Sequence, residues 1–125
     1  MGTKQVLVMR KFKSLRTGKY CAQAAHASMA SFLDARQAMF FDEDTRAADY
    51  TEEWLANSFT KITLYVDTEK ELKDLQRQCD EAHIPNALIT DNGTTEFNEP
   101  TVTALGIGPW LNEEINEITK DLKLF

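Results

Sequence analysis

Three side chains that can do chemistry recur at helical spacing in the stretch GKYCAQAAHASMASF, residues 18–32. They are Lys19, Gln23 and His26, at positions i, i+4 and i+7. At roughly 100° per residue, these positions fall within about 60° of one another on a helix. The spacing therefore predicts one polar stripe of chemically capable groups.

The opposite arc of the same helix carries residues that are small near its start and bulky near its end. We expect this arc to be the face that packs on the core, with its small residues letting the amino end of the helix approach a sheet closely. Its members are Cys21, Ala25, Ser28, Met29 and Phe32.

Further polar candidates lie far along the chain. Asp91 directly follows an expected strand at 86–90, and Thr95 follows it in the polar loop DNGTTEFNEPT. In open α/β sheets, ligands bind beyond the carboxyl ends of the strands. The helix that carries Lys19 begins after the first expected strand and a connector, so we expect it at the same edge of the sheet.

Hydrophobic periodicity predicts the elements that must position these groups. Short apolar runs bounded by turn residues predict four strands, at residues 5–9, 61–66, 86–90 and 102–107. Caps and helical spacing predict helices at 18–32 with continuation through 35–41, at 51–57, at 68–83 and after Pro109. The expected caps of the first three are Thr17, Thr51 and Thr68.

Strands that alternate with helices predict an α/β fold with a mostly parallel or mixed sheet covered on both faces. The chain has 125 residues, which suits one domain over residues 1–125. No apolar run approaches the roughly 18 residues of a membrane helix, and the amino terminus lacks a hydrophobic signal core. These features predict a soluble, cytoplasmic protein.

Charge is distributed unevenly along the chain. Net charge is −6, yet residues 1–33 hold six basic side chains and no acidic one. Local field rather than net charge decides where a polyanion binds, so Lys11, Lys13 and Arg16 are candidate phosphate contacts. On charge alone, a solvated basic loop is an equally good interpretation. The acidic segment 42–53 is interpreted as a solvated face.

Other sites are excluded or interpreted as structural. Cys21 and Cys79 stand far apart without metal-ligand spacing, so they indicate neither a disulfide framework nor a zinc site, and we expect both to be buried. Phe40, Phe41 and Trp54 are expected in the core rather than as a base-stacking platform. No dinucleotide fingerprint, P-loop or GxSxG motif occurs.

Five segments together resemble one known family. They read KQVLVMRK, GKYCAQAAHA, KITLYV, DNGTTEFNEPTVTALGIGP and ITKDLKLF. In this order the chain resembles the archaeal/eukaryotic type of peptidyl-tRNA hydrolase, the second of two unrelated enzyme types with that activity. The resemblance implies a four-stranded mixed sheet with helices on both faces, often a dimer. It also implies cofactor-free hydrolysis of the ester that joins a peptide to the terminal ribose of tRNA.

The same resemblance implies a catalytic site. Its residues are Lys19, Gln23 and His26 from the helix motif and Asp91, Thr95 and Thr103 from the loop and strand motif. Asp91 would orient or deprotonate water, directly or with His26. Lys19 would hold either the developing oxyanion or the 3′ phosphate. Thr95 and Thr103 would donate hydrogen bonds, and Gln23 would fix Lys19 or the substrate.

The chain departs from the family's usual pattern within this loop. Asn92 and Thr94 stand where the family usually has alanine and arginine, and Pro100 replaces a glycine. Thr94 and the acidic balance motivate a second hypothesis, a non-catalytic RNA- or protein-binding module on the same fold. In the leading hypothesis the basic strip at Lys11, Lys13 and Arg16 contacts the tRNA backbone.

Overall fold

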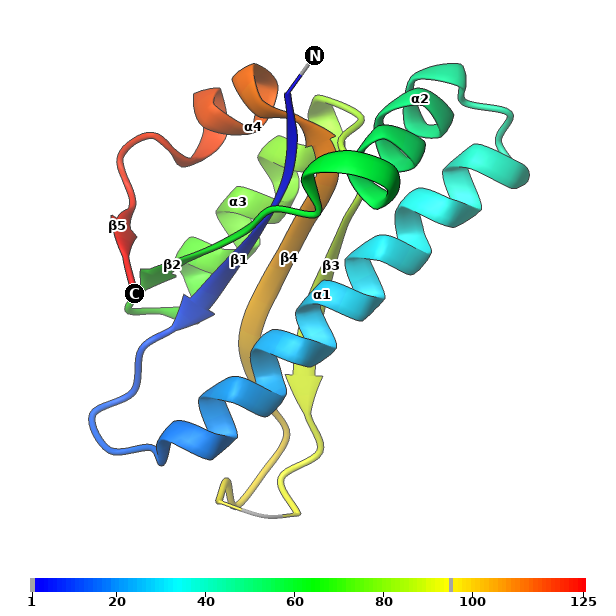
Figure 1. Cartoon of the computed structure of the whole chain (residues 1–125). Coiled ribbons are helices and arrows are strands. Elements are labelled where there is room, and N and C mark those ends of the chain that lie inside the picture. The colour runs from blue at the N-terminus through cyan, green and yellow to red at the C-terminus, as the bar shows by residue number, and fades with distance from the viewer. Residues whose placement is uncertain (1, 95) are drawn as a thin grey trace.

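The computed structural model describes residues 2–94 and 96–125 (Figure 1). In chain order the elements are β1 (Thr3–Arg10), α1 (Thr17–Phe40), α2 (Thr45–Glu53), the short π-helix η1 (Trp54–Ser58), β2 (Lys61–Val66), α3 (Glu69–Glu81), β3 (Asn86–Asp91), β4 (Thr101–Leu111), α4 (Asn112–Thr119) and β5 (Lys123–Leu124). The α/β class predicted from the sequence is confirmed. No helix in these ranges is both long and apolar enough to span a membrane.

The described residues form one mixed sheet of five strands in the order β3-β4-β1-β2-β5. β1 and β2 are parallel, whereas β4 is antiparallel to both β1 and β3. The prediction of a four-stranded sheet was therefore one strand short. β5 pairs with β2 only through Leu64↔Leu124 and Tyr65↔Lys123. A two-residue strand carries no periodic signal, so only its long-range pairing reveals it.

Helices cover both faces of the sheet, as predicted. α1 crosses one face and contacts β1, β3 and β4, while α3 and α4 pack on the other (Figure 1). α2 packs against α1 and β4. This arrangement leaves the first turns of α1 beside the loop that joins β3 to β4.

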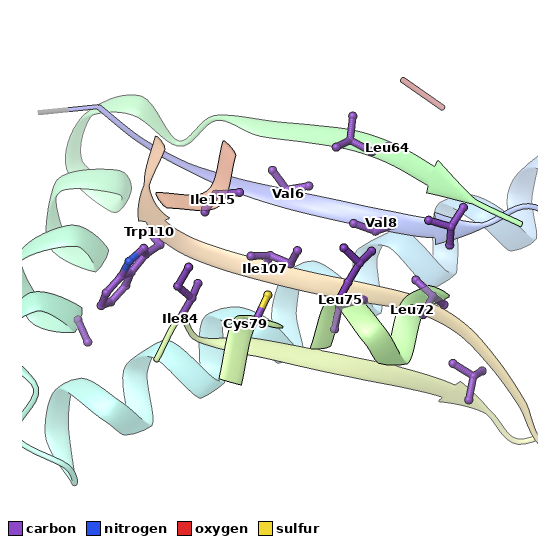
Figure 2. Packing of buried hydrophobic residues seen from close by; sticks show 14 residues of the cluster. Val6, Val8, Leu64, Leu72, Leu75, Cys79, Ile84, Ile107, Trp110 and Ile115 are labelled. Carbon is purple, nitrogen blue, oxygen red and sulfur yellow. The ribbon is translucent and has the colours of Figure 1, made fainter. Parts of the chain in front are cut away.

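The two faces bury different amounts of apolar surface. On the α3 side a large cluster joins strand residues such as Val6, Val8 and Ile107 to Leu72 and Leu75 of α3 (Figure 2). On the α1 side the buried apolar cluster is small. Its members are Leu7, Met9, Ala27 and Ala104.

The face that α1 turns to the sheet differs from the predicted one. Its buried residues are Gln23, Ala27, Ser31 and Ala35, whereas Cys21, Ala25 and Met29 are exposed. Backbone contact explains this rotation, because a Cβ on Gly106 of β4 would lie 2.2 Å from the carbonyl oxygen of Ala27. The closest approach to the sheet is thus at mid-helix and requires glycine, and part of the predicted polar stripe is buried.

Two helix starts also differ from the predictions. Thr17 is the first residue of α1, and Arg16 occupies the cap position without a side-chain hydrogen bond. α2 begins six residues before the predicted start, because the Asp44 carboxylate accepts the backbone N–H groups of Arg46 and Ala47. Thr51, the predicted cap, is buried inside α2. The predicted cap of α3 is confirmed, since Thr68 Oγ1 accepts the Glu71 N–H.

The last helix begins at Asn112 rather than near Pro109, because β4 continues to Leu111. Tertiary hydrogen bonds hold this end of β4. The Gly108 N–H donates to the Pro85 carbonyl, and the Gly108 carbonyl accepts the Ser31 hydroxyl at 2.6 Å. A glycine-proline pair is typical of a turn, and these long-range bonds override that local signal.

Some of the residues that were expected in the core are buried, and others are exposed. Trp54 and Cys79 are buried as predicted. Phe40, Phe41 and Cys21 are exposed, contrary to the prediction. The two phenylalanines lie at the carboxyl end of α1, beyond the sheet face that the helix covers, so hydrophobicity alone did not decide their environment.

Candidate functional site

The fold brings two distant segments to one edge of the sheet. β3 and β1 are both antiparallel to β4, so their carboxyl ends lie at the same edge as the start of β4. The connector after β1 leads into α1 at this edge (Figure 1). Asp91 ends β3, Thr103 lies near the start of β4, and Lys19 and Gln23 lie in the first two turns of α1.

These four side chains form one hydrogen-bonded cluster. The Lys19 ammonium donates to Asp91 Oδ1 at 2.6 Å, and the Gln23 amide donates to the same oxygen at 3.3 Å. The Thr103 hydroxyl donates to Gln23 Oε1 at 2.6 Å. Gln23 therefore bridges the strand and the carboxylate, and its buried position makes this bridge rigid.

The cluster holds a charged pair that is mostly removed from solvent. The side chains of Lys19 and Asp91 are 12% and 11% exposed. The Lys19 hydrogen bond and the Gly93 N–H hold the pKa of the Asp91 carboxyl below its usual value, against the opposing effect of burial. Asp91 is thus a carboxylate at neutral pH, and its oxygens face donors rather than other acids.

Local backbone geometry fixes the Asp91 carboxylate. Its second oxygen, Oδ2, accepts the Gly93 N–H at 2.9 Å, which is a side-chain turn of the kind aspartate favours. Gly93 has φ +80°, and a Cβ there would lie 2.5 Å from the backbone of Glu99. Glycine is therefore required for the loop to fold back at this point.

The remaining predicted catalytic residues are placed differently. His26 is exposed on the turn after Gln23 and lines a surface groove with Thr90 and Asn92. Among the described residues, Asp91 accepts hydrogen bonds from Lys19, Gln23 and Gly93, and His26 is not one of these donors. Thr95 lies outside the described residues.

The predicted tRNA contacts lie in the connector between β1 and α1. Lys11, Lys13 and Arg16 are all exposed. The Lys11 ammonium lies 4.7 Å from the centre of the Tyr65 ring, and the Arg16 guanidinium lies 3.7 Å from the Glu96 carboxylate. The basic segment thus borders the Lys19 end of α1, with one acidic residue of the β3–β4 loop beside it.

Two aromatic residues near the cluster were missed by the sequence prediction. The Phe97 ring centre lies 5.8 Å from the Lys19 ammonium and 4.9 Å from the Phe12 ring centre. Phe97 is the only aromatic residue in the sequence of the loop 92–100, and that isolation is a signal that could have found it. The pair packs the β1–α1 connector against the β3–β4 loop and shields one side of Lys19.

The geometry can support acid-base or electrostatic chemistry without metal ligation by these groups. Among the residues that the structure describes, no group of three or more histidine, cysteine, aspartate or glutamate side chains could hold a metal ion. The cluster combines a lysine, a carboxylate and two neutral hydrogen-bonding groups at the carboxyl end of β3. Such groups can polarise a carbonyl and orient a water molecule.

Sequence comparison relates this chain to known proteins. The family model described as peptidyl-tRNA hydrolase PTH2 matches residues 3–125. A peptidyl-tRNA hydrolase of Methanopyrus kandleri is 39% identical over 121 residues, covering 97% of both chains. Those of Methanocaldococcus jannaschii and Thermococcus sibiricus are 37% and 32% identical over 121 residues, covering 97% of this chain and 98% and 96% of the relatives. The chain therefore belongs to the peptidyl-tRNA hydrolase PTH2 family.

Proposed function

We propose that this protein hydrolyses the ester bond between peptide and tRNA in peptidyl-tRNA, and that the Lys19–Asp91 cluster is its catalytic site. The observation that carries the proposal is the mostly buried Lys19–Asp91 pair, braced by Gln23 and Thr103, in a chain that matches the family over nearly its whole length. The family assignment favours a carboxylic ester hydrolase of translation over a non-catalytic binding module.

The reaction needs an oriented water, a stabilised oxyanion and a proton for the leaving group. The water oxygen adds to the ester carbon, the bond from that carbon to the ribose oxygen breaks, and the proton that the water gives up ends on the ribose oxygen. In our proposal the Asp91 carboxylate orients the water, directly or together with His26. Lys19 holds the negative charge that develops on the ester carbonyl oxygen.

The other site residues position this pair. Gln23 is a positioning residue because it holds Asp91 on one side and accepts from Thr103 on the other. Thr95 is proposed as a further hydrogen-bond donor on the basis of its place in the family motif. No cofactor enters the proposal, since water supplies the nucleophile and the charged pair supplies the electrostatic stabilisation.

Hydrolysis of a defined peptidyl-tRNA tests the proposal. We expect release of free tRNA by the wild type and a loss of at least about 100-fold in Lys19→Ala and in Asp91→Ala, because each removes a charged group from the site. Lys70→Ala and Asp74→Ala are matched controls, since they break an exposed lysine-aspartate pair of 2.9 Å on α3. Absence of turnover by the folded wild type would refute the proposed activity.

The basic segment is proposed to hold the acceptor-stem backbone through contacts that do not read sequence. Replacing Lys11, Lys13 and Arg16 together with alanine should weaken tRNA binding and reduce the salt slope of log Kd by about 2 to 3. Binding of a deacylated tRNA at several salt concentrations measures this. An unchanged slope would place the phosphate contacts elsewhere on the protein.

Two further inferences concern the location of the protein and its oligomeric state. We infer a cytoplasmic enzyme, because its substrate arises in translation. We also infer a homodimer, which the resemblance stated above implies. Light scattering on the purified protein tests the second inference, since a mass of about 28 kDa supports a dimer and the chain mass of 14.2 kDa contradicts it.

A further inference from the structure

A groove of about 500 Å³ lies between α1 and the outer strand β3. From α1 it is lined by His26, Ala30 and Leu33, and from β3 by Leu88, Ile89 and Thr90. Asn92 lines its end, directly after Asp91. The groove therefore reaches the residue next to Asp91 and is apolar along most of its length.

The groove and the catalytic lysine share one flank of α1. At roughly 100° per residue, Lys19, Ala30 and Leu33 fall within about 60° of one another. A second apolar groove, lined by Ala24, Ser28, Phe32 and Leu55 among others, lies on the opposite flank beside η1. Of these two grooves, the β3 groove is the one lined by Asn92, the neighbour of Asp91.

The outer edge of β3 offers backbone hydrogen-bonding groups to this groove. In an antiparallel pair, alternate residues direct their N–H and C=O groups toward the partner strand and away from it. The Asn86 N–H donates to the Asp34 carboxylate of α1 at 3.0 Å, so Asn86 faces away from β4. Leu88 lies two residues further in the same register, so its N–H and C=O also point away from β4.

We propose that this groove binds the peptide part of peptidyl-tRNA as an extended strand parallel to β3, an inference that rests on the proposed function. The ester carbon is the carboxyl end of the peptide and lies at Asp91, so the peptide runs back toward Asn86. An extended chain that pairs with the free edge of a strand gains main-chain hydrogen bonds whatever its sequence. Such binding suits an enzyme whose substrates carry unrelated peptides.

The same geometry limits the length of peptide that is read. The Asp34 carboxylate accepts the Asn86 N–H, so that donor is already engaged and does not pair with a bound peptide. From Asp91 back to Leu88 is about 10 Å of strand, enough for about three residues. We therefore expect kcat/KM to rise as the peptide grows to about three residues and to level off beyond that length.

Two substrates and three variants test the inference. The substrates are a tRNA that carries one N-acetylated amino acid and a tRNA that carries an N-acetylated apolar tetrapeptide. Leu33→Ser removes apolar lining of the groove, and Leu88→Pro removes one outward N–H of an edge strand, a position where proline is tolerated. Leu55→Ser is the matched control. Leu33 and Leu55 are each 49% exposed, but Leu55 belongs to η1 and lines the other groove, on the opposite flank of α1.

For the wild type, kcat/KM should be about tenfold higher for the tetrapeptide, as expected for partial burial of one or two apolar side chains. In Leu33→Ser and Leu88→Pro this ratio should fall toward one, because kcat/KM for the tetrapeptide substrate falls. Leu55→Ser should keep the ratio. Circular dichroism confirms that each variant is folded, and Leu33→Ser alone decides the result if Leu88→Pro is not.

Three results would overturn the inference while leaving the proposed function intact. They are a wild-type ratio near one, an unchanged ratio in Leu33→Ser, and an equal fall of the ratio in Leu55→Ser. A changed oligomeric state of Leu33→Ser with an unchanged ratio would assign the groove to a second copy of the chain. Absence of turnover on both substrates by the wild type would refute the proposed function itself.

Discussion

The two faces of the sheet are built from different chemistry. The α3 face buries a continuous apolar cluster in which Val6, Val8 and Ile107 meet Leu72 and Leu75 (Figure 2). The α1 face buries few large apolar side chains and a row of polar ones instead. These are Gln5, Gln23, Ser31 and Thr103, none more than 2% exposed. One face therefore supplies most of the apolar burial, and the other holds the candidate site.

The polar side chains of the α1 face are hydrogen-bonded, which is why they are tolerated there. Ser28 donates to Gln5 Oε1 at 2.6 Å, and Ser31 donates to the Gly108 carbonyl at 2.6 Å. Gln23 and Thr103 continue the row to Asp91. Directional bonds fix the height and rotation of α1 more sharply than apolar contact does, and this places Lys19 on Asp91.

The largest expected effect on stability is at a residue of the α3 face, where activity should be unaffected. Leu72→Ala should lower the free energy of unfolding by about 3 kcal/mol, because it opens a cavity in the fully buried cluster. Activity measured well below the melting temperature should stay within about twofold of wild type. Denaturant unfolding and the hydrolysis assay measure the two quantities. A selective loss of activity in the folded variant would show that the two faces are not separate.

A smaller effect on stability but a larger one on activity is expected on the α1 face. Gln23→Leu removes the acceptor of the Thr103 hydroxyl and one donor to Asp91, and should cost about 1–3 kcal/mol of stability. Because Asp91 loses its brace, kcat should fall about 10- to 100-fold. Gln37→Leu, an exposed change on the same helix, is the control. Equal effects of the two variants would remove Gln23 from the positioning network.

The smallest expected effect is a pH dependence. The pKa of Asp91 is lowered in the folded protein, so its carboxylate stabilises the fold above the unfolded value of about 3.9, and the stabilisation is lost as pH falls through the lower folded pKa. The difference in melting temperature between wild type and Asp91→Asn should thus stay constant from pH 7 to about 4 and shrink below it. Thermal melts across this range measure it.

Salt should weaken the ion pair on the α3 face more than the Lys19–Asp91 pair on the α1 face. Asp74 also has a lowered pKa, because Lys70 donates a hydrogen bond to its exposed carboxylate on α3. In about 0.5 M NaCl the effect of Asp74→Asn should be screened, whereas that of Asp91→Asn should persist, because the Lys19–Asp91 pair is mostly buried. Equal screening of both pairs would mean that Asp91 is as open to solvent as Asp74.

Much of this architecture could be predicted because it rests on local signals. Periodicity and caps, which act within a few residues, predict the strand at 61–66, the helix capped by Thr68 and the continuation of α1 to about residue 41. The long loop after Asp91 was also predicted from its polarity. The starts of α2 and α4 could not be predicted, because competing caps and long-range bonds decide them.

The sequence by itself determined the α/β class, the family and the identity of the residues that meet at the sheet edge. Only the tertiary structure decided how they meet. α1 rests on the sheet where Ala27 contacts Gly106, so Gln23 points inward to Thr103 and Asp91. On the flank of the helix, His26 and Leu33 line the groove beside β3. The sequence prediction placed Met29 on the core face of the helix because it took the arc opposite the polar stripe, and so it missed this rotation. Close backbone packing and buried hydrogen bonds act between residues about 80 positions apart, and no local pattern records them.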